Sequence, residues 1–303
     1  MYQTAEFRDQ DGTAPPPELE KKSLSLASLL KDIDSESIPI IRRQLLFQEG
    51  ETTKKFPCTI QNSSNYYQYT LGYQLFKTYL KQQEIEINDC ILPLQIKNKV
   101  FNRLEQNVGG YHNLDAGGYQ IMINYLGQND DTIQSKSITD VLNHPEFAPE
   151  YSHKVILIGY DFDVDSNLKK DDVFQTPYGK MRGVFIHAQM VNQLLSAVLD
   201  DRPLIIASPQ YLSIIWIAVC VTLGNIFLYS LKQILRNSFV TLIPFFCFVF
   251  VPVFSVGFPL FSGYVSLVVF SVWIPMVAPI VGLVISSGLF VVYNVIEEAG
   301  QNE

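Results

Sequence analysis

Residues 154–199 read KVILIGYDFDVDSNLKKDDVFQTPYGKMRGVFIHAQMVNQLLSAVL, and this stretch decides the expected fold. It opens with a continuous apolar run, Lys154–Gly159, which is typical of a β-strand covered on both faces. After an Asp-rich loop and a Thr-Pro turn, the run Phe185–Leu199 predicts a helix. Its apolar side chains recur at helical spacing, at Ile186, Met190, Leu194, Leu195 and Val198. A strand, a loop and a helix in this order favour an α/β fold.

The residues upstream predict more elements of the same domain. We expect strands at Ile38–Gln48, Leu92–Ile96 and Tyr119–Tyr125, because these runs are apolar or flanked by turn residues. We expect helices at Asn65–Gln82 and Ser137–Leu142. In the latter, Ser137 and Asp140 stand in capping-box-like places. The expected fold class is a soluble α/β domain over 31–210, with a mixed sheet and flanking helices.

The rest of the chain has the composition of a membrane segment. Between positions 211 and 296 the only Lys, Arg, Asp or Glu side chains are Lys232 and Arg236. We therefore predict three transmembrane helices, at about 211–229, 239–258 and 272–296. Two-span and four-span arrangements stay open. We interpret the apolar residues 259–271 as a turn plus an extension of a neighbouring helix.

Charge sets the expected orientation and excludes one class of partner. Lys232 and Arg236 follow the first span, so the positive-inside bias puts that loop in the cytoplasm. The α/β domain then lies outside the membrane, and the tail 297–303 lies inside. The net charge of −8 is unfavourable for binding nucleic acid.

The N-terminal residues 1–30 predict a flexible segment rather than a signal peptide. They are rich in Pro and charge and contain no apolar h-region. An exported domain needs such a signal, so three hypotheses remain. The chain is a fragment of a longer protein, its start is assigned too late, or the domain stays in the cytoplasm.

Several motifs together resemble one known family. KVILIG, an Asp-rich loop, TPYGKMRGVFIHAQMVNQLLSA and three apolar spans follow one another as in the C-terminal part of CHASE2 domains. The upstream segments IRRQLL, YTLGYQLFKTYL and GGYHNLDAGGYQIMINYLG keep the order of that family. Two departures stand out. Arg182 occupies a position where the family usually has Pro, and the first part of the domain and its leading membrane helix are not recognised.

The resemblance implies a bacterial, membrane-anchored sensory input module that binds an extracytoplasmic stimulus. It implies no enzyme activity, no cofactor and no effector domain in this sequence. The expected location is the inner (plasma) membrane, as a multi-pass protein. The expected partners are the membrane, a signalling or effector protein, a second copy of the chain and an unidentified small-molecule ligand. The alternative is a structural or assembly subunit that holds a partner protein.

Four residues are candidate ligand contacts: Asp172, Thr176, His187 and Arg42. Each has a simpler structural interpretation. Thr176-Pro177 is a turn signature, and His187 suits a capping or core position. Of Arg42 and Arg43, one is expected at the surface and one beside an acid, because neighbours on a strand face opposite ways.

A metal site is a weaker hypothesis. Asp161, Asp163, Asp165 and Asp172 have the spacing of positions 1, 3, 5 and 12 of a calcium loop. Ser166 stands where the turn requires Gly, and Lys169 repels a cation. We therefore expect a solvated loop here and no metal.

Overall fold

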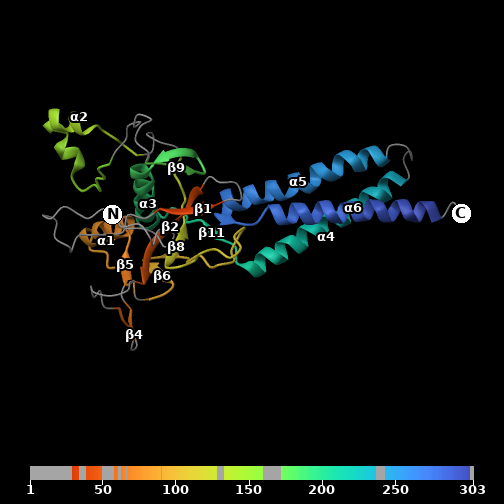
Figure 1. Ribbon diagram of the computed structural model, residues 1–303, viewed down its shortest axis with the longest axis horizontal. Coiled ribbons are helices and arrows are strands. Elements are labelled where there is room, and N and C mark those ends of the chain that lie inside the picture. Colours follow the sequence, from red (N-terminus) through yellow and green to blue (C-terminus); the bar gives the residue numbers. More distant parts are fainter. Residues whose placement is uncertain are drawn as a thin grey trace. The chain divides into compact units, whose positions relative to one another are not determined.

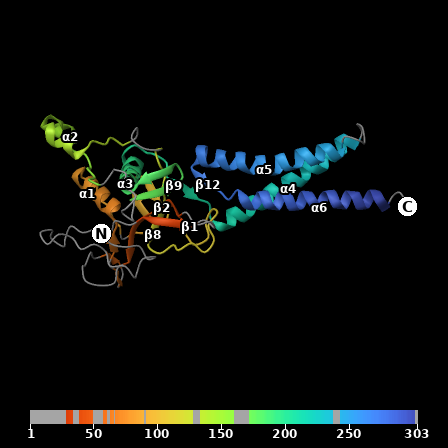
Figure 2. The same ribbon diagram turned by 45° about the horizontal axis from the view of Figure 1, so that its top comes forward.

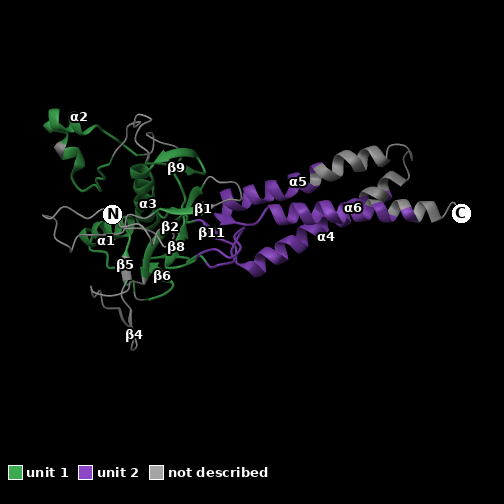
Figure 3. Cartoon of the chain, viewed as in Figure 1, with its two compact units in different colours: residues 1–104, 116–204 green, residues 105–115, 205–303 purple. Residues whose placement is uncertain are grey.

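The computed structural model describes residues 29–33, 39–49, 58–60, 63–65, 67–89, 91–127, 133–159, 172–236 and 243–300. Figure 3 shows the two compact units into which the chain divides. Unit 1 comprises residues 1–104 and 116–204, and unit 2 comprises residues 105–115 and 205–303.

Unit 1 is built on a mixed, six-stranded sheet around the long strand β2 (Figures 1 and 2). Its strands are β1 (Leu30–Ile33), β2 (Pro39–Glu49), β5 (Tyr67–Tyr69), β8 (Tyr119–Met122), β9 (Val173–Thr176) and β10 (Gly179–Arg182). Strand β2 pairs antiparallel with β1, β5 and β8, and parallel with β9 at Ile40 and Gln175. Two short hairpins complete the strands, β3 (Cys58–Ile60) with β4 (Ser63–Asn65) and β6 (Leu94–Ile96) with β7 (Lys99–Phe101).

Two helices of this unit, Leu71–Gln82 and Gly183–Leu199, pack on the core of this sheet, as the sequence predicts for an α/β domain. The helices of unit 1 are α1 (Leu71–Gln82), α2 (Ile138–Asn143), η3 (Pro145–Tyr151) and α3 (Gly183–Leu199). Ser137 caps α2, because its hydroxyl accepts a hydrogen bond from the Asp140 amide at 3.0 Å. Helix α1 begins later than expected. Thr70 caps it, and the residues before Thr70 form β4 and β5 instead.

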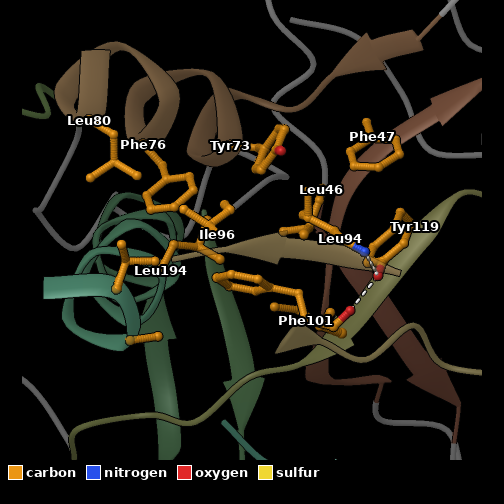
Figure 4. Close-up of a cluster of buried hydrophobic side chains, with 13 residues drawn as sticks. Leu46, Phe47, Tyr73, Phe76, Leu80, Leu94, Ile96, Phe101, Tyr119 and Leu194 are labelled. Atoms are coloured by element: carbon orange, nitrogen blue, oxygen red, sulfur yellow. Dashed lines mark hydrogen bonds between the residues drawn. The ribbon is translucent and has the colours of Figure 1, made fainter. Parts of the chain in front are cut away.

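Aromatic and aliphatic side chains from α1, α3 and the strands fill the main core. Figure 4 shows Tyr73, Phe76 and Leu80 of α1 above Leu94 and other strand residues of this core. The Tyr119 hydroxyl lies at its edge, where it accepts a hydrogen bond from the Leu94 amide at 3.0 Å and donates one to the Phe101 carbonyl. This core fixes α1 and α3 on the sheet.

One expected strand is wrong. Residues 154–159, KVILIG, form no strand, and Ile156 and Ile158 are 56% and 83% exposed. Within the described residues no strand pairs with this segment. An apolar, β-branched run favours a strand only where a neighbouring strand accepts its backbone hydrogen bonds.

Unit 2 contains three long helices and a small two-stranded sheet. They are α4 (Gln210–Arg236), α5 (Ile243–Phe270), α6 (Val277–Gly300) and the parallel pair β11 (Ile206–Ala207) with β12 (Val272–Trp273). Residues 259–270 continue α5 and the chain turns at Ser271, which has φ of +54°, so the expected extension and the expected turn are both present. The third helix begins at Val277 rather than at 272, because Val272 and Trp273 pair with β11.

Glycine allows α4 and α6 to approach each other closely. A Cβ atom at Gly224 of α4 would lie 2.1 Å from the Leu283 side chain of α6. A Cβ atom at Gly282 of α6 would lie 2.9 Å from Val221 of α4. Such contacts between small and large residues are typical of helices packed in lipid.

One described segment has the length and composition of a membrane span, Gln210–Ser230 in α4, with a mean hydropathy of 2.1. The segments Ser255–Phe270 and Val277–Phe290 are apolar but shorter. The first expected span is therefore supported by its composition, and the other two stay predictions.

Candidate functional site

The β9–β10 hairpin and the start of α3 hold three of the four predicted ligand residues. Thr176 ends β9, and its buried hydroxyl donates to the Gly179 carbonyl at 2.8 Å and accepts from the Tyr178 amide at 3.2 Å. The hydroxyl thus closes the two-residue turn between the strands, as the turn signature predicts. A ligand that accepts a hydrogen bond from Thr176 would need the bond to Gly179 to open, whereas a ligand that donates one could use the second lone pair of the hydroxyl oxygen.

Asp172 directly precedes β9, and it also contacts Gly183, the first residue of α3. Its carbonyl accepts a hydrogen bond from the Gly183 amide at 3.0 Å. Its carboxylate oxygens lie 2.6 and 2.7 Å from the position that a Cβ atom of Gly183 would take. A side chain at the first residue of α3 would therefore have to displace the Asp172 carboxylate. Partial burial raises the pKa of Asp172, and the charge of Arg182 opposes that rise.

His187 lies one turn into α3, and its surroundings keep it neutral. Burial lowers the pKa of its imidazole to about 4. Among the described residues its Nδ1 atom has no hydrogen-bond partner. The N-cap residue of α3 is Arg182, so His187 does not cap the helix. A neutral imidazole with a free nitrogen can accept or donate one hydrogen bond, which suits a polar, uncharged ligand group.

The two arginines of β2 differ in burial, and both approach Asp32 of β1. Arg43 is buried, and its Nε donates to the Asp32 carboxylate at 2.5 Å. Its Nη1 donates to the side chain of Gln120 on β8. Arg42 is the more exposed of the two, with Nη1 3.9 Å from the same carboxylate. Asp32 thus pairs with both arginines and not with one as expected, and Arg43 ties three strands together.

The sequence did not indicate the role of two glutamines on α3. Gln193 accepts a hydrogen bond from the Asn124 amide and donates to the Met122 carbonyl at 3.0 Å. Gln189 accepts from the Leu126 amide at 3.1 Å. These two side chains form hydrogen bonds with the backbone at the end of β8 and after it, in the place of a neighbouring strand. This is why the strand ends at Met122 and not at Tyr125 as predicted. The sequence signal that could have revealed this role is the spacing of the two glutamines, four positions apart in an otherwise apolar helix.

Asp89 is a second buried acid, in the segment that follows α1. Asp89 accepts hydrogen bonds from the hydroxyls of Tyr69, at 2.5 Å, and Tyr73, at 3.0 Å, and it pairs with Lys77. Burial, together with the Asp89 charge, raises the pKa of Tyr73. This cluster attaches α1 to β5, and all its members are already bonded to one another. It therefore stabilises the domain rather than offering a site.

The metal hypothesis mostly falls outside the described residues. Asp161, Asp163 and Asp165 are not among them, and Asp172 adjoins the start of α3 instead. In the described ranges no three His, Cys, Asp or Glu side chains gather as a metal-binding group.

Comparison with models of known protein families gave a match over most of the sequence. The sequence model of the CHASE2 domain matches residues 4–226, which include unit 1, the loop 105–115 and the first part of α4. No curated protein and no solved structure matches the chain significantly. The CHASE2 domain is an extracytoplasmic sensor domain of membrane-bound signalling proteins. Because the match covers well over half of the sequence, this chain belongs to the CHASE2 family.

Proposed function

We propose that this chain is a membrane-anchored sensory input module. Its CHASE2 domain receives an extracytoplasmic stimulus, the C-terminal helices carry the change across the membrane, and another protein domain produces the output. One observation carries this proposal. The family match ends at residue 226, inside α4, so the sensor domain continues directly into an apolar helix.

The exposure of α4 favours lipid as its surroundings. A core helix of a soluble protein is mostly buried, but only 22% of the apolar window of α4 is buried. Its exposed side chains include Ile214, Ile215 and Ile226. Contact of such a surface with water costs about 25 cal/mol per Å² of apolar area, and a bilayer removes that cost.

The charges at the end of α4 favour an external CHASE2 domain. Lys232 and Arg236 lie in the last turns of the helix, and Gln210 begins it. Basic residues at a helix end gather on the cytoplasmic side of the membrane. The domain that precedes Gln210 would then be outside.

The candidate site favours binding over catalysis. The Thr176 hydroxyl is engaged in a turn, and the His187 imidazole is neutral. We propose that the stimulus is sensed near Asp172 and His187. Thr176 and Arg42 are two further candidate contacts. The start of α3 is common to the first two residues, so a ligand there would act on α3 directly.

Cysteine labelling tests the topology. In a chain whose native cysteines are replaced by Ala, Glu86→Cys marks the exposed surface of unit 1 and Arg236→Cys marks the end of α4. We expect a membrane-impermeant maleimide to label Glu86→Cys in intact cells and Arg236→Cys only in inside-out vesicles. The reverse pattern would reject an external domain.

Thermal melting separates a sensor from an assembly subunit. The full chain in lipid nanodiscs is heated with a panel of extracellular amino acids, sugars, carboxylates and phosphate. A sensor is expected to melt at a higher temperature with one class of compound, and His187→Ala is expected to reduce that shift. A stable co-purifying partner with no shift for any compound would support the assembly subunit instead.

A further inference from the structure

The chain passes between the two units at three places, and these places determine how a change in unit 1 reaches the helices. The crossings lie at residues 104–105, 115–116 and 204–205. The first two bound the loop 105–115, and the third lies in the linker from α3 to β11. At each crossing, hydrogen bonds inside unit 1 identify the element to which the chain is attached on the unit 1 side.

The loop 105–115 leaves unit 1 from the N-terminal end of β8. The Leu104 amide donates to the Gln120 carbonyl of β8 at 2.9 Å. Arg103 Nη2 donates to the Ala116 carbonyl at 3.0 Å. These two bonds join the ends of the loop to each other. Gln120 also accepts from Arg43, so the loop is tied to the buried ion pair of the sheet.

The linker leaves unit 1 from the C-terminal extension of the same strand. Arg202 Nη2 donates to the carbonyls of Asn124, at 2.8 Å, and Tyr125, at 3.2 Å. The Asn124 side chain donates to the Pro203 carbonyl at 2.9 Å. Gln193 of α3 binds the Asn124 amide. The segment 116–125 therefore holds all three crossings and is also bonded to α3.

In unit 2 the loop and the linker meet. The Gly109 amide donates to the Ser208 carbonyl at 2.7 Å. The Trp273 ring covers Gly109, where a Cβ atom would lie 2.7 Å from the ring, and Tyr111 stands edge-on to it with the centroids 5.0 Å apart. Gly109 has φ of +56°, which also favours glycine. We call residues 108–111, 206–209 and 272–273 the collar.

The collar is attached to the helices of unit 2 on both sides. The linker enters α4 directly after Pro209, and Ser208 and Ser213 hydroxyls bond at 2.9 Å. Strand β12 follows the end of α5 and precedes α6. The Ser266 hydroxyl of α5 donates to the Val272 carbonyl at 2.9 Å. A displacement of the collar therefore acts on all three helices.

We infer that the segment 116–125 is the transmission strand of this protein. It is bonded to α3 through Gln193, which contacts Asn124 and Met122, and to the buried Arg43 through Gln120. The loop and the linker that leave it both end in one collar. A movement of α3 shifts the segment, and the loop and the linker pass that shift to the collar together. This inference rests on the proposed sensory function, since it names the route by which that function operates.

The test uses the full chain in lipid nanodiscs, with Trp216→Phe so that Trp273 is the only tryptophan. Arg202→Met removes the bonds to Asn124 and Tyr125, and Asn124→Ala removes the bond to Pro203. The matched control is Lys136→Met, which removes the same charge from an exposed ion pair with Glu150 elsewhere in unit 1. The measurements are amide hydrogen exchange of residues 105–115 and acrylamide quenching of Trp273.

We expect Arg202→Met and Asn124→Ala to accelerate exchange in the loop about fivefold and to raise Trp273 quenching, with no change for the control. If Arg202→Met lowers the helix content of unit 1, the milder Asn124→Ala decides. The inference is overturned if both variants leave the loop and Trp273 unchanged while Gly109→Ala, which acts inside the collar, alters both. That result would leave the labelling pattern intact, so it would not count against the proposed function.

Discussion

In the core of unit 1 aromatic rings pack against one another, whereas α4 and α6 of unit 2 approach each other where glycine meets a large aliphatic side chain. Phe47 stacks on Tyr119 with the centroids 5.0 Å apart, and Tyr73 contacts Phe76 at 5.8 Å. In unit 2, Gly224 faces Leu283. Unit 1 buries a core of large apolar side chains, whereas α4 exposes many of its own. The proposed membrane anchoring accounts for this difference by two solvents, water around unit 1 and lipid around α4.

The largest expected effect comes from the core of unit 1. Phe76 is fully buried between Tyr73 and Phe101, so Phe76→Ala removes a large side chain that its neighbours cannot replace. We expect a loss of about 4 kcal/mol in the free energy of unfolding, measured by urea titration with hydrogen exchange of unit 1. Leu142→Ala is the control, because Leu142 is 75% exposed and its loss is expected to be near zero. Equal losses would show that Phe76 is not in a packed core.

The second-largest expected effect is a loss of folding stability at acidic pH, caused by His187. Its pKa in the folded chain is about 4, below the ordinary 6.5. Between these values the unfolded chain binds the proton and the folded chain does not. The stabilisation is therefore complete above about pH 6.5, and about 3 kcal/mol of it is lost as the pH falls to 4. Melting of His187→Gln between pH 4 and 7.5 is expected to show a weaker pH dependence, whereas the exposed His112→Gln should behave as the native chain does. An unchanged slope in His187→Gln would contradict the burial of this imidazole.

In unit 2 a small residue should matter for packing too, though less than the large Phe76 does in unit 1. Gly224→Ala places a methyl group against the buried Leu283, and we expect a loss of about 2 kcal/mol in SDS unfolding titrations of the full chain. Gly288→Ala is the control. No atom lies within 4 Å of its Cβ position, so this change should stabilise the helix slightly.

A double-mutant cycle sharpens that prediction. Leu283→Ala removes the side chain that the new methyl group meets. If α4 and α6 pack as described, the cost of Gly224→Ala is much smaller in the Leu283→Ala background. Additive losses would mean that the two residues do not face each other.

The smallest expected effect comes from Thr176. Its measurement distinguishes a role in the turn from a role in ligand binding. Thr176→Val keeps the shape of the side chain but removes the two hydrogen bonds of the β9–β10 turn, so we expect a loss of about 1 kcal/mol in stability. Thr78→Val is the control, since the Thr78 hydroxyl bonds only within the exposed face of α1. A loss of ligand-dependent melting without a loss of stability would instead assign Thr176 to binding.

Local patterns were sufficient to predict the elements of unit 1 whose partners lie nearby. The apolar spacing of 185–199 predicts α3, and the turn residues after Thr176 predict the turn between β9 and β10 but not the two strands themselves. The run KVILIG predicted a strand that did not form, because a strand also needs a neighbour that no local pattern supplies. The early end of β8 depends on Gln189 and Gln193, which lie more than sixty residues away.

The collar and the candidate site could be predicted only in part. Asp172, Thr176 and His187 lie close together in sequence, and the hairpin keeps them near the start of α3. The collar joins Gly109, Ser208 and Trp273, which are far apart in the chain and have no shared motif. Such a contact follows from the fold as a whole, so the sequence contained no signal for it.

Lipid quenching of two matched tryptophans tests the two-solvent account most directly. In a chain with Trp216→Phe and Trp273→Phe, Leu223→Trp probes α4 and Leu126→Trp probes unit 1. These leucines are 47% and 42% exposed. In proteoliposomes with acyl chains brominated near their ends, we predict strong quenching of Leu223→Trp and none of Leu126→Trp. Equal quenching of the two, or quenching of Leu223→Trp by aqueous iodide instead, would contradict the account.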